Sequence, residues 1–150
     1  MRILAIDYGT VRVGTALSDE LGILASPFRL LRYSRAVVEE IAKIVEEHNV
    51  GTVVVGMPTA PNGEDSLTVR QVRNFVERLH GALPNATVTT WDESRSTLRA
   101  VGMMQSAGVG RKGRREDGKR DLWAAALILQ EYLEAERESR KRDQGSSGRN

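Results

Sequence analysis

The chain has 150 residues, of which 40% are hydrophobic and 28% are charged, a size and balance typical of one domain with one core. It contains no cysteine, which excludes a disulfide framework and a cysteine-ligated zinc site. No stretch of about 18 apolar residues is present, so a membrane-spanning helix is excluded, no secretory leader is recognised, and we expect a cytoplasmic protein.

The first third of the chain predicts three strands joined by short connections. Residues 2–6 carry apolar side chains on both faces, which is typical of a central strand that is covered on both sides. Residues 11–17 and 23–31 are the second and third predicted strands, and their short spacing predicts antiparallel hairpins.

The middle of the chain alternates predicted helices and strands. Ser34 is expected to cap a helix whose apolar face recurs at helical spacing through residues 37–48. The elements expected after it are a β-branched strand at 51–57, a loop at 58–63, a helix with an apolar stripe from Val69 to Leu79, and a strand at 86–91.

The last third predicts helices at residues 96–107 and 119–137, separated by a glycine-rich basic loop at 108–118. Residues 139–150 have nothing to bury, so we expect a domain over 1–138 and a disordered basic tail after it. Three hairpin strands followed by alternating strands and helices predict an α/β fold. Its five-stranded mixed sheet should have three antiparallel strands and then parallel additions, with helices on its faces.

The formal net charge of +2 is unevenly distributed along the chain. Residues 109–120 contain six basic and two acidic side chains, a local charge of +4 that leaves −2 for the remaining residues. A concentrated basic segment on a nearly neutral body predicts a local anionic partner.

Acidic residues fall where predicted strands end and where the last helix starts. Asp7 ends the first strand, Asp92 and Glu93 end the fifth, and Asp121 lies in the first turn of the last helix. Strand ends place functional groups at one edge of an open α/β sheet, so these acids can converge there. Taken singly, Asp7 could also be a turn former and the others helix-capping carboxylates.

Three carboxylates at one edge of a sheet repel one another unless a cation neutralises them. Their oxygen atoms suit Mg²⁺ or Mn²⁺, and two such ions bound together with substrate can hold the attacking and leaving oxygens of a phosphodiester. The arrangement therefore predicts metal-assisted hydrolysis, in which coordination lowers the pKa of the attacking water.

Four segments of the sequence together resemble one known family: DYGTVRVGTALSD, VVVGMP, WDESRST and KRDLWAAALILQEYL. In order and spacing they are similar to the YqgF/RuvX family of RuvC-like nucleases, over roughly residues 1 to 135. The resemblance implies a ribonuclease H-like fold and a nuclease. The implied activity is either resolution of Holliday junctions or trimming of the precursor of 16S ribosomal RNA.

The resemblance also implies which acids are catalytic. Carried over by position, the catalytic and metal-binding residues correspond to Asp7, Glu93 and Asp121. This selects Glu93 over Asp92, which strand alternation alone cannot do because it only places the two on opposite faces.

Basic residues are the expected nucleic-acid contacts. Arg12 matches a basic residue of the family's opening motif, although the lysine before it is Val11 here. The family's arginine after Asp-Glu is displaced by one residue to Arg95, and because one residue on a helix is about 100°, Arg95 need not reproduce the usual contact. The other expected contacts are Arg111, Lys112, Arg114, Arg115 and Lys119.

The basic loop contains no aromatic residue, so we expect contacts to phosphates and recognition of shape rather than base stacking. A solvated surface loop without a partner is the alternative. Trp91 and Trp123 are expected to pack at the core or its rim rather than stack on bases.

Two other functional classes remain open from the sequence. Gly9, Thr10 and Gly14 resemble the turn that binds ATP phosphates in related ATPases, but a single domain needs a homodimer to supply the second wall around a nucleotide. The other class is a non-catalytic nucleic-acid-binding or ribosome-assembly factor. The sequence leaves open whether the substrate is structured RNA or branched DNA, and whether the chain forms a homodimer.

Overall fold

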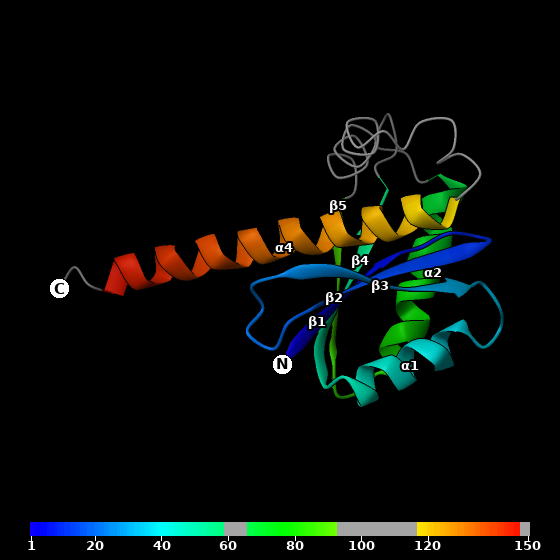
Figure 1. The fold of residues 1–150 in the computed structure, drawn as a ribbon, viewed down its shortest axis with the longest axis horizontal. Helices are drawn as coiled ribbons and strands as arrows, with labels where there is room; N and C mark the ends of the chain where they lie inside the picture. The colour runs from blue at the N-terminus through cyan, green and yellow to red at the C-terminus, as the bar shows by residue number, and fades with distance from the viewer. Residues whose placement is uncertain (59–65, 93–116, 148–150) are drawn as a thin grey trace.

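The computed structural model describes residues 1–58, 66–92 and 117–147, which form a mixed sheet with helices on both faces (Figure 1). The strands are β1 Arg2–Asp7, β2 Arg12–Ser18, β3 Ala25–Arg32, β4 Val50–Met57 and β5 Thr87–Asp92. Their order across the sheet is β3-β2-β1-β4-β5. The first three strands pair antiparallel, and β4 and β5 are added parallel to β1. The predicted five-stranded mixed sheet is therefore confirmed.

Three described helices cover the sheet: α1 Val37–Glu47, α2 Leu67–Ala82 and α4 Asp117–Ser147. The short helices α1 and α2 lie on one face, and the long helix α4 crosses the other (Figure 1). Each face of the sheet is therefore covered, as the apolar runs of β1 and β4 require.

Strand β1 divides its side chains between two cores. Leu4 and Ile6 are fully buried in the larger core beneath α1 and α2. Ala5 is fully buried in a smaller core under α4, where the facing residues include Ala16 and Ala125. Because these three residues are alanines, α4 can approach the sheet closely. This short distance determines the position of Asp121, which α4 carries.

The predicted cap at Ser34 is wrong. Helix α1 begins at Val37 with Ala36 as its N-cap, and Ala36 makes no capping hydrogen bond through its side chain. The Ser34 hydroxyl instead accepts a hydrogen bond from the Ala36 backbone N–H at 3.2 Å, which forms a turn just before the helix. A serine does cap α2, where the Ser66 hydroxyl accepts from the Val69 backbone N–H.

The last helix is longer than expected. The sequence predicted disorder over residues 139–150, whereas α4 continues to Ser147 and projects beyond the sheet (Figure 1). Residues 137–145 are exposed, so the expectation that they bury nothing holds. They are rich in Arg, Lys, Glu and Gln, which have high helix propensity, and Glu138 pairs with Arg142 one turn later at 3.9 Å.

Several predicted elements lie outside the described residues: the helix at 96–107, nearly all of the loop at 58–63, and the basic loop up to residue 116. Within the described ranges, no helix combines the length and apolar character needed to span a lipid bilayer.

Candidate active site

Asp7 is the last residue of β1, and its position in the strand directs it toward α4. Ile3 and Ala5, the residues two and four positions earlier, pack in the core under α4. Side chains alternate along a strand, so Asp7 falls on this same face. It is partly buried and is paired across the strands with Gly14 of β2.

Asp121 reaches the same place from α4. The helix begins at Asp117, so Asp121 lies one turn inside it, four residues before the fully buried Ala125. A Cβ atom added to Gly14 would lie 2.6 Å from the carbonyl carbon of Asp121 and 3.1 Å from its Cβ. Gly14 therefore touches the backbone of Asp121 while facing Asp7 across the sheet. The structure brings these two predicted catalytic acids to one point.

Arg12 lies beside one of the two acids, Asp121. It lies two residues before Gly14 on β2 and so shares its face. Its Nε atom is 3.3 Å from Oδ2 of Asp121, although the two residues are 109 positions apart in the sequence. The side chains are 36% and 28% exposed, so water screens the pair and its net contribution to stability is small.

The turn after Asp7 is anchored on the opposite side of the sheet. The Tyr8 ring packs against Phe75 of α2 with centroids 4.9 Å apart and meets the Tyr33 ring edge-on at 5.7 Å. Burial raises the pKa of Tyr8 above its ordinary value, and a hydrogen bond with Tyr33 adds to this. Asp7 and Tyr8 therefore point to different layers, and the packing of Tyr8 holds the strand end that carries Asp7.

Sequence reasoning missed the parts that Tyr8 and Gly14 play. The only signal for Tyr8 was its place between an acid and a glycine. Gly14 was noticed, but as a residue that could approach a phosphate, whereas the α4 backbone occupies the space beside it. A side chain on Gly9 would similarly collide with the carbonyl oxygen of Arg12, so Gly9 serves the tight turn between β1 and β2.

The third predicted acid, Glu93, lies outside the described residues, as do Arg95, Arg111, Lys112, Arg114 and Arg115. Glu93 follows Asp92, the last residue of β5, which pairs with Met57 at the end of β4. Since β4 also runs parallel to β1, the strands bearing Asp7 and Asp92 end at one edge of the sheet. Lys119 is described and lies exposed in the first turn of α4.

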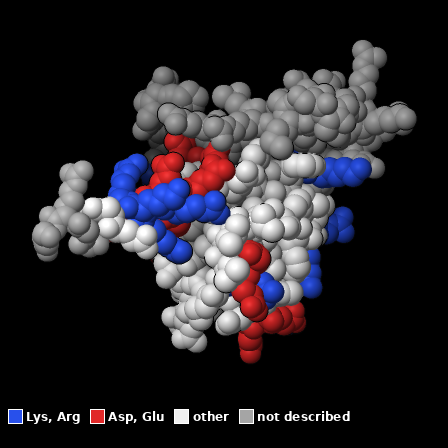
Figure 2. Space-filling view, turned by 60° about the vertical axis from the view of Figure 1, so that its left-hand side comes forward, with Lys and Arg blue, Asp and Glu red and all other residues white. Residues whose placement is uncertain are grey.

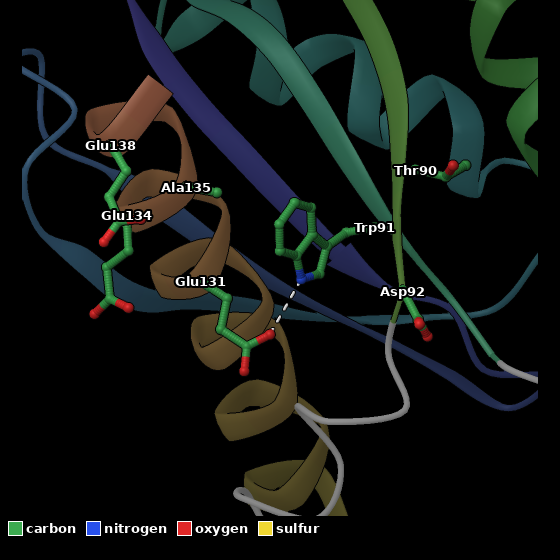
Figure 3. A pocket seen from close by; sticks show the side chains of 7 residues that line it. All are labelled: Thr90, Trp91, Asp92, Glu131, Glu134, Ala135 and Glu138. Atoms are coloured by element: carbon green, nitrogen blue, oxygen red, sulfur yellow. Dashed lines mark hydrogen bonds between the residues drawn. The ribbon is translucent and has the colours of Figure 1, made fainter. Parts of the chain in front are cut away.

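The described part of the chain contains no group of three or more histidine, cysteine, aspartate or glutamate side chains that could hold a metal ion. Asp7 and Asp121 form only part of the expected set. Asp92 does not complete it, because Thr90 and Asp92 leave β5 on the face away from α4, whereas Trp91 points toward that helix (Figure 3).

A pocket of about 470 Å³ lies beside this edge, between β5 and α4 (Figure 3). Trp91 packs edge-on against Tyr132, and its indole N–H donates to the Glu131 carboxylate at 3.1 Å. Glu134 and Glu138 also line the pocket. Trp91 is thus a packing residue at the rim, as expected, and the acidic lining disfavours phosphate there.

Charges of both signs meet where α4 leaves the body. Figure 2 shows acidic side chains directly beside basic ones on this part of the surface. Along this stretch of α4, Arg137 and Arg140 alternate with Glu134 and Glu138. The projecting end of α4 is therefore not a uniformly basic surface.

Comparison with known proteins assigns the chain to a family. The family model described as "RuvX: Holliday junction resolvase" matches residues 1–135. A protein of Chlorobaculum tepidum named "Putative pre-16S rRNA nuclease" is 36% identical over 134 residues, covering 89% of this chain and 94% of that protein. One of the same name from Syntrophus aciditrophicus is 40% identical over 137 residues, covering 90% and 89%.

Solved structures support the fold. The RuvC protein of T. thermophilus, in complex with a Holliday junction substrate, superposes with a TM-score of 0.58 at 12% identity, covering 91% of this chain and 95% of that one. The fowlpox virus Holliday junction resolvase superposes with a TM-score of 0.57 at 12% identity, covering 90% and 99%. The predicted ribonuclease H-like fold is thus confirmed, and at this identity the likeness concerns the fold alone.

Proposed function

Because this chain belongs to the RuvX family, whose model is described as a Holliday junction resolvase, we propose that it is a divalent-metal-dependent nuclease that hydrolyses phosphodiester bonds of structured nucleic acid. The observation that carries the proposal is the meeting of Asp7 and Asp121 at Gly14. These carboxylates come from the first strand and the last helix, and no local structural need brings them together.

The donor set fits a hard divalent cation. Asp7 and Asp121 supply only oxygen ligands, which Mg²⁺ and Mn²⁺ prefer, and the guanidinium of Arg12 beside Asp121 indicates that this position favours positive charge. Glu93 is proposed as the third ligand, and a second ion is proposed to bind together with the substrate phosphate. When bound, such ions activate water and stabilise charge on the reacting phosphate.

Arg12 and the basic residues are proposed to hold the substrate. Arg12 lies beside Asp121 with a partly exposed side chain, so its guanidinium can reach a phosphate at the same edge of the sheet. Lys119 lies exposed in the first turn of α4. We propose further phosphate contacts from the sequence alone: Arg95, Arg111, Lys112, Arg114 and Arg115. Contacts to phosphate would bind any nucleic acid of suitable shape.

We place precursor 16S ribosomal RNA first among substrates. The relatives that carry the name "Putative pre-16S rRNA nuclease" share 35–40% identity over most of their length, whereas the solved junction resolvases share 10–13%. Branched DNA is the second candidate, supported by the family description and by the solved complex with a junction. A cytoplasmic location suits either substrate and the absence of cysteine.

The test is cleavage of end-labelled precursor 16S RNA and of a labelled four-way DNA junction, each with Mg²⁺ or Mn²⁺. We expect Asp7→Asn to lower the cleavage rate by at least about a hundredfold, because one metal ligand loses its charge. The same protein should still bind the RNA. Asp143→Asn, the same change on the exposed end of α4, should cleave at the wild-type rate.

Other results would assign the chain differently. If the wild type binds RNA but cleaves neither substrate with either metal, the chain is a binding or assembly factor. If it hydrolyses ATP without nucleic acid, the ATPase-like class is correct. The molecular mass of the protein in solution, measured with and without the junction, would show whether it binds the junction as a homodimer. Symmetric cuts in a junction require two active sites.

A further inference from the structure

The two acids of the candidate site are joined through one residue, Gly14. We infer that Gly14 is a positioning residue: by leaving room for the α4 backbone, it sets the distance between Asp7 and Asp121 and so makes the site selective for a small divalent cation. This inference rests on the proposed metal site, because the two carboxylates need a defined separation only if they share an ion.

Glycine is not needed at position 14 for backbone freedom. Among the glycines in the described ranges, Gly22 has a positive φ. Gly14 lies within β2, and its φ is not in the positive range that favours glycine. Nor is the space beside it left for a ligand. Any Cβ there would lie 2.6 Å from the carbonyl carbon of Asp121, inside the contact distance of about 3.5 to 4.0 Å between carbon atoms. The missing side chain is therefore explained by the helix.

Strand β2 is held from the opposite face of the sheet, although its pairing with β3 shifts register between Gly14 and Ala16. Val13 and Thr15, the neighbours of Gly14 on β2, are both fully buried on the opposite face of the sheet. The Thr15 hydroxyl donates to the Arg29 carbonyl oxygen at 2.6 Å and accepts from the Arg29 backbone N–H at 2.9 Å, which holds β2 against β3. A displacement at position 14 should therefore fall mainly on α4.

The helix end can move only outward. Ala125, one turn beyond Asp121, is fully buried against Ala5 and Ala16 in the core under α4. Restoring an ordinary contact at Gly14 would lift the first turns of α4 by about 1 Å. Asp7 would stay in place on β1, so the two carboxylates would separate by a similar amount.

Cations differ in how much of such a change they accept. Mg²⁺ requires near-octahedral geometry with ligands at about 2.0 to 2.1 Å, whereas Ca²⁺ takes flexible arrangements with ligands at about 2.3 to 2.6 Å. Moving one carboxylate by about 1 Å should weaken Mg²⁺ binding far more than Ca²⁺ binding. A change in the ratio of the two affinities is thus the signature of a positioning role, which general destabilisation would not produce.

The experiment measures the affinities of the full chain for Mg²⁺ and Ca²⁺. Each ion competes with bound Mn²⁺, and electron paramagnetic resonance measures the Mn²⁺ that is released. For Gly14→Ala we expect Mg²⁺ affinity to fall at least about tenfold while Ca²⁺ affinity changes by less than about threefold. Gly81→Ala is the matched control, since a Cβ at that position in α2 has nothing within 4 Å. It should leave both affinities unchanged.

Two further variants keep the test decisive. Leu133→Ala removes buried packing near the other end of the α4 contact, so it should lower the melting temperature and leave the ratio of affinities unchanged. Ala125→Val should lift the same end of α4 by a second route and reproduce the effect of Gly14→Ala. It replaces Gly14→Ala if that protein does not fold.

The inference is overturned if folded Gly14→Ala, or Ala125→Val in its place, keeps the wild-type ratio of Mg²⁺ to Ca²⁺ affinity. It is also overturned if Leu133→Ala changes that ratio equally, because the effect would then be one of general packing. These outcomes leave the proposed nuclease intact. If the wild-type chain binds no Mn²⁺, the proposed metal site itself is wrong and the role of Gly14 is removed with it.

Discussion

Among single residues, Arg12 has two partners that compete for it. In the structure its guanidinium is 3.3 Å from the Asp121 carboxylate, and in the proposed reaction it contacts a substrate phosphate. A metal ion at Asp121 would compete with the same ion pair. Arg12 should therefore oppose metal binding in the absence of nucleic acid and promote it once a phosphate draws the guanidinium away.

Arg12→Gln tests this competition. We expect metal affinity without nucleic acid to rise about two- to fivefold, the range that corresponds to the net strength of a partly exposed ion pair. RNA binding should weaken, since one phosphate contact is lost. Isothermal titration of Mn²⁺, with and without RNA, measures both effects. Arg70→Gln, the same change on the exposed face of α2, should alter neither, and equal effects of the two variants would contradict the idea.

Tyr8 gives a prediction about alkaline pH. Its pKa is raised in the folded chain by burial and by its hydrogen bond with Tyr33, so the folded state keeps the proton more tightly than the unfolded state does. The associated stability is complete below the unfolded pKa of about 10 and is lost as the pH rises through the folded pKa. Tyr8→Phe has no proton to lose.

The fall in melting temperature of Tyr8→Phe between about pH 9 and pH 11.5 should therefore be shallower than that of the wild type. The slope should not vanish, because burial also raises the pKa of Tyr132. Thermal unfolding followed by circular dichroism measures this. Identical slopes for the two proteins would mean that Tyr8 titrates normally in the folded chain.

Among the elements, α4 serves two different purposes along its length. Residues 124–129 are all buried and Leu133 is the last buried residue up to position 145, whereas residues 137–145 are exposed. The helix therefore binds to the sheet through its first half alone. The projecting half follows from local propensity and contributes little to the core.

A chain that ends after Arg137 should fold as well as the full chain. Its melting temperature should lie within about 3 °C of the wild type, because the described side chains beyond Arg137, up to residue 145, are all exposed. By contrast, Leu133→Ala should cost about 2 to 4 kcal/mol, since it opens a cavity under α4. Differential scanning calorimetry of both proteins distinguishes these. A large loss on truncation would show that the projecting half makes stabilising contacts.

The elements were predictable where the signal is local. Alternating or continuous apolar runs identified all five strands, and helical spacing identified α1 and α2. The error at Ser34 arose because a serine before an apolar stripe can form either a cap or a preceding turn. The end of α4 was missed because absence of burial was taken to mean disorder, although charged helix formers can continue a helix that is already nucleated by packing.

The candidate site was predictable only in part. Strand ends and the start of a helix indicated that Asp7 and Asp121 converge, and the structure brings them to Gly14. The contacts that hold them were not predictable, because the partners of Gly14 and Tyr8 lie far along the chain. No local pattern says that a glycine of the second strand meets the last helix, or that Tyr8 meets Phe75.

For the whole molecule, the distribution of charge matters more than the net charge of +2. The sequence between residues 109 and 120 carries +4, while the described pocket beside β5 is lined by carboxylates. An anionic polymer should therefore be attracted by this basic segment and repelled by the acidic pocket. Such binding releases counterions and depends steeply on salt.

Neutralising Arg114 and Arg115 together should make the plot of log K for nucleic-acid binding against log salt concentration less steep by roughly 1.4 to 1.8. This is the change expected when two phosphate contacts are lost. Fluorescence anisotropy with labelled RNA between 50 and 300 mM salt measures the slope. A control protein that loses Lys43 and Arg70, exposed on α1 and α2, should keep the wild-type slope. If Arg114 and Arg115 can be removed with no change in slope, they do not contact phosphate.

Strand β1 has a consequence for how inherited changes in this chain would behave. Leu4 and Ile6 belong to the large apolar core, whereas Ile3 and Ala5 pack in the smaller core on the face that leads to Asp7. In living cells, replacements at Leu4 or Ile6 should lower the amount of protein that escapes proteolysis, while replacements at Asp7 should leave abundance normal and abolish turnover. Neighbouring codons of one strand would thus give two kinds of loss-of-function allele, one from the buried positions and one from the acid at the strand end.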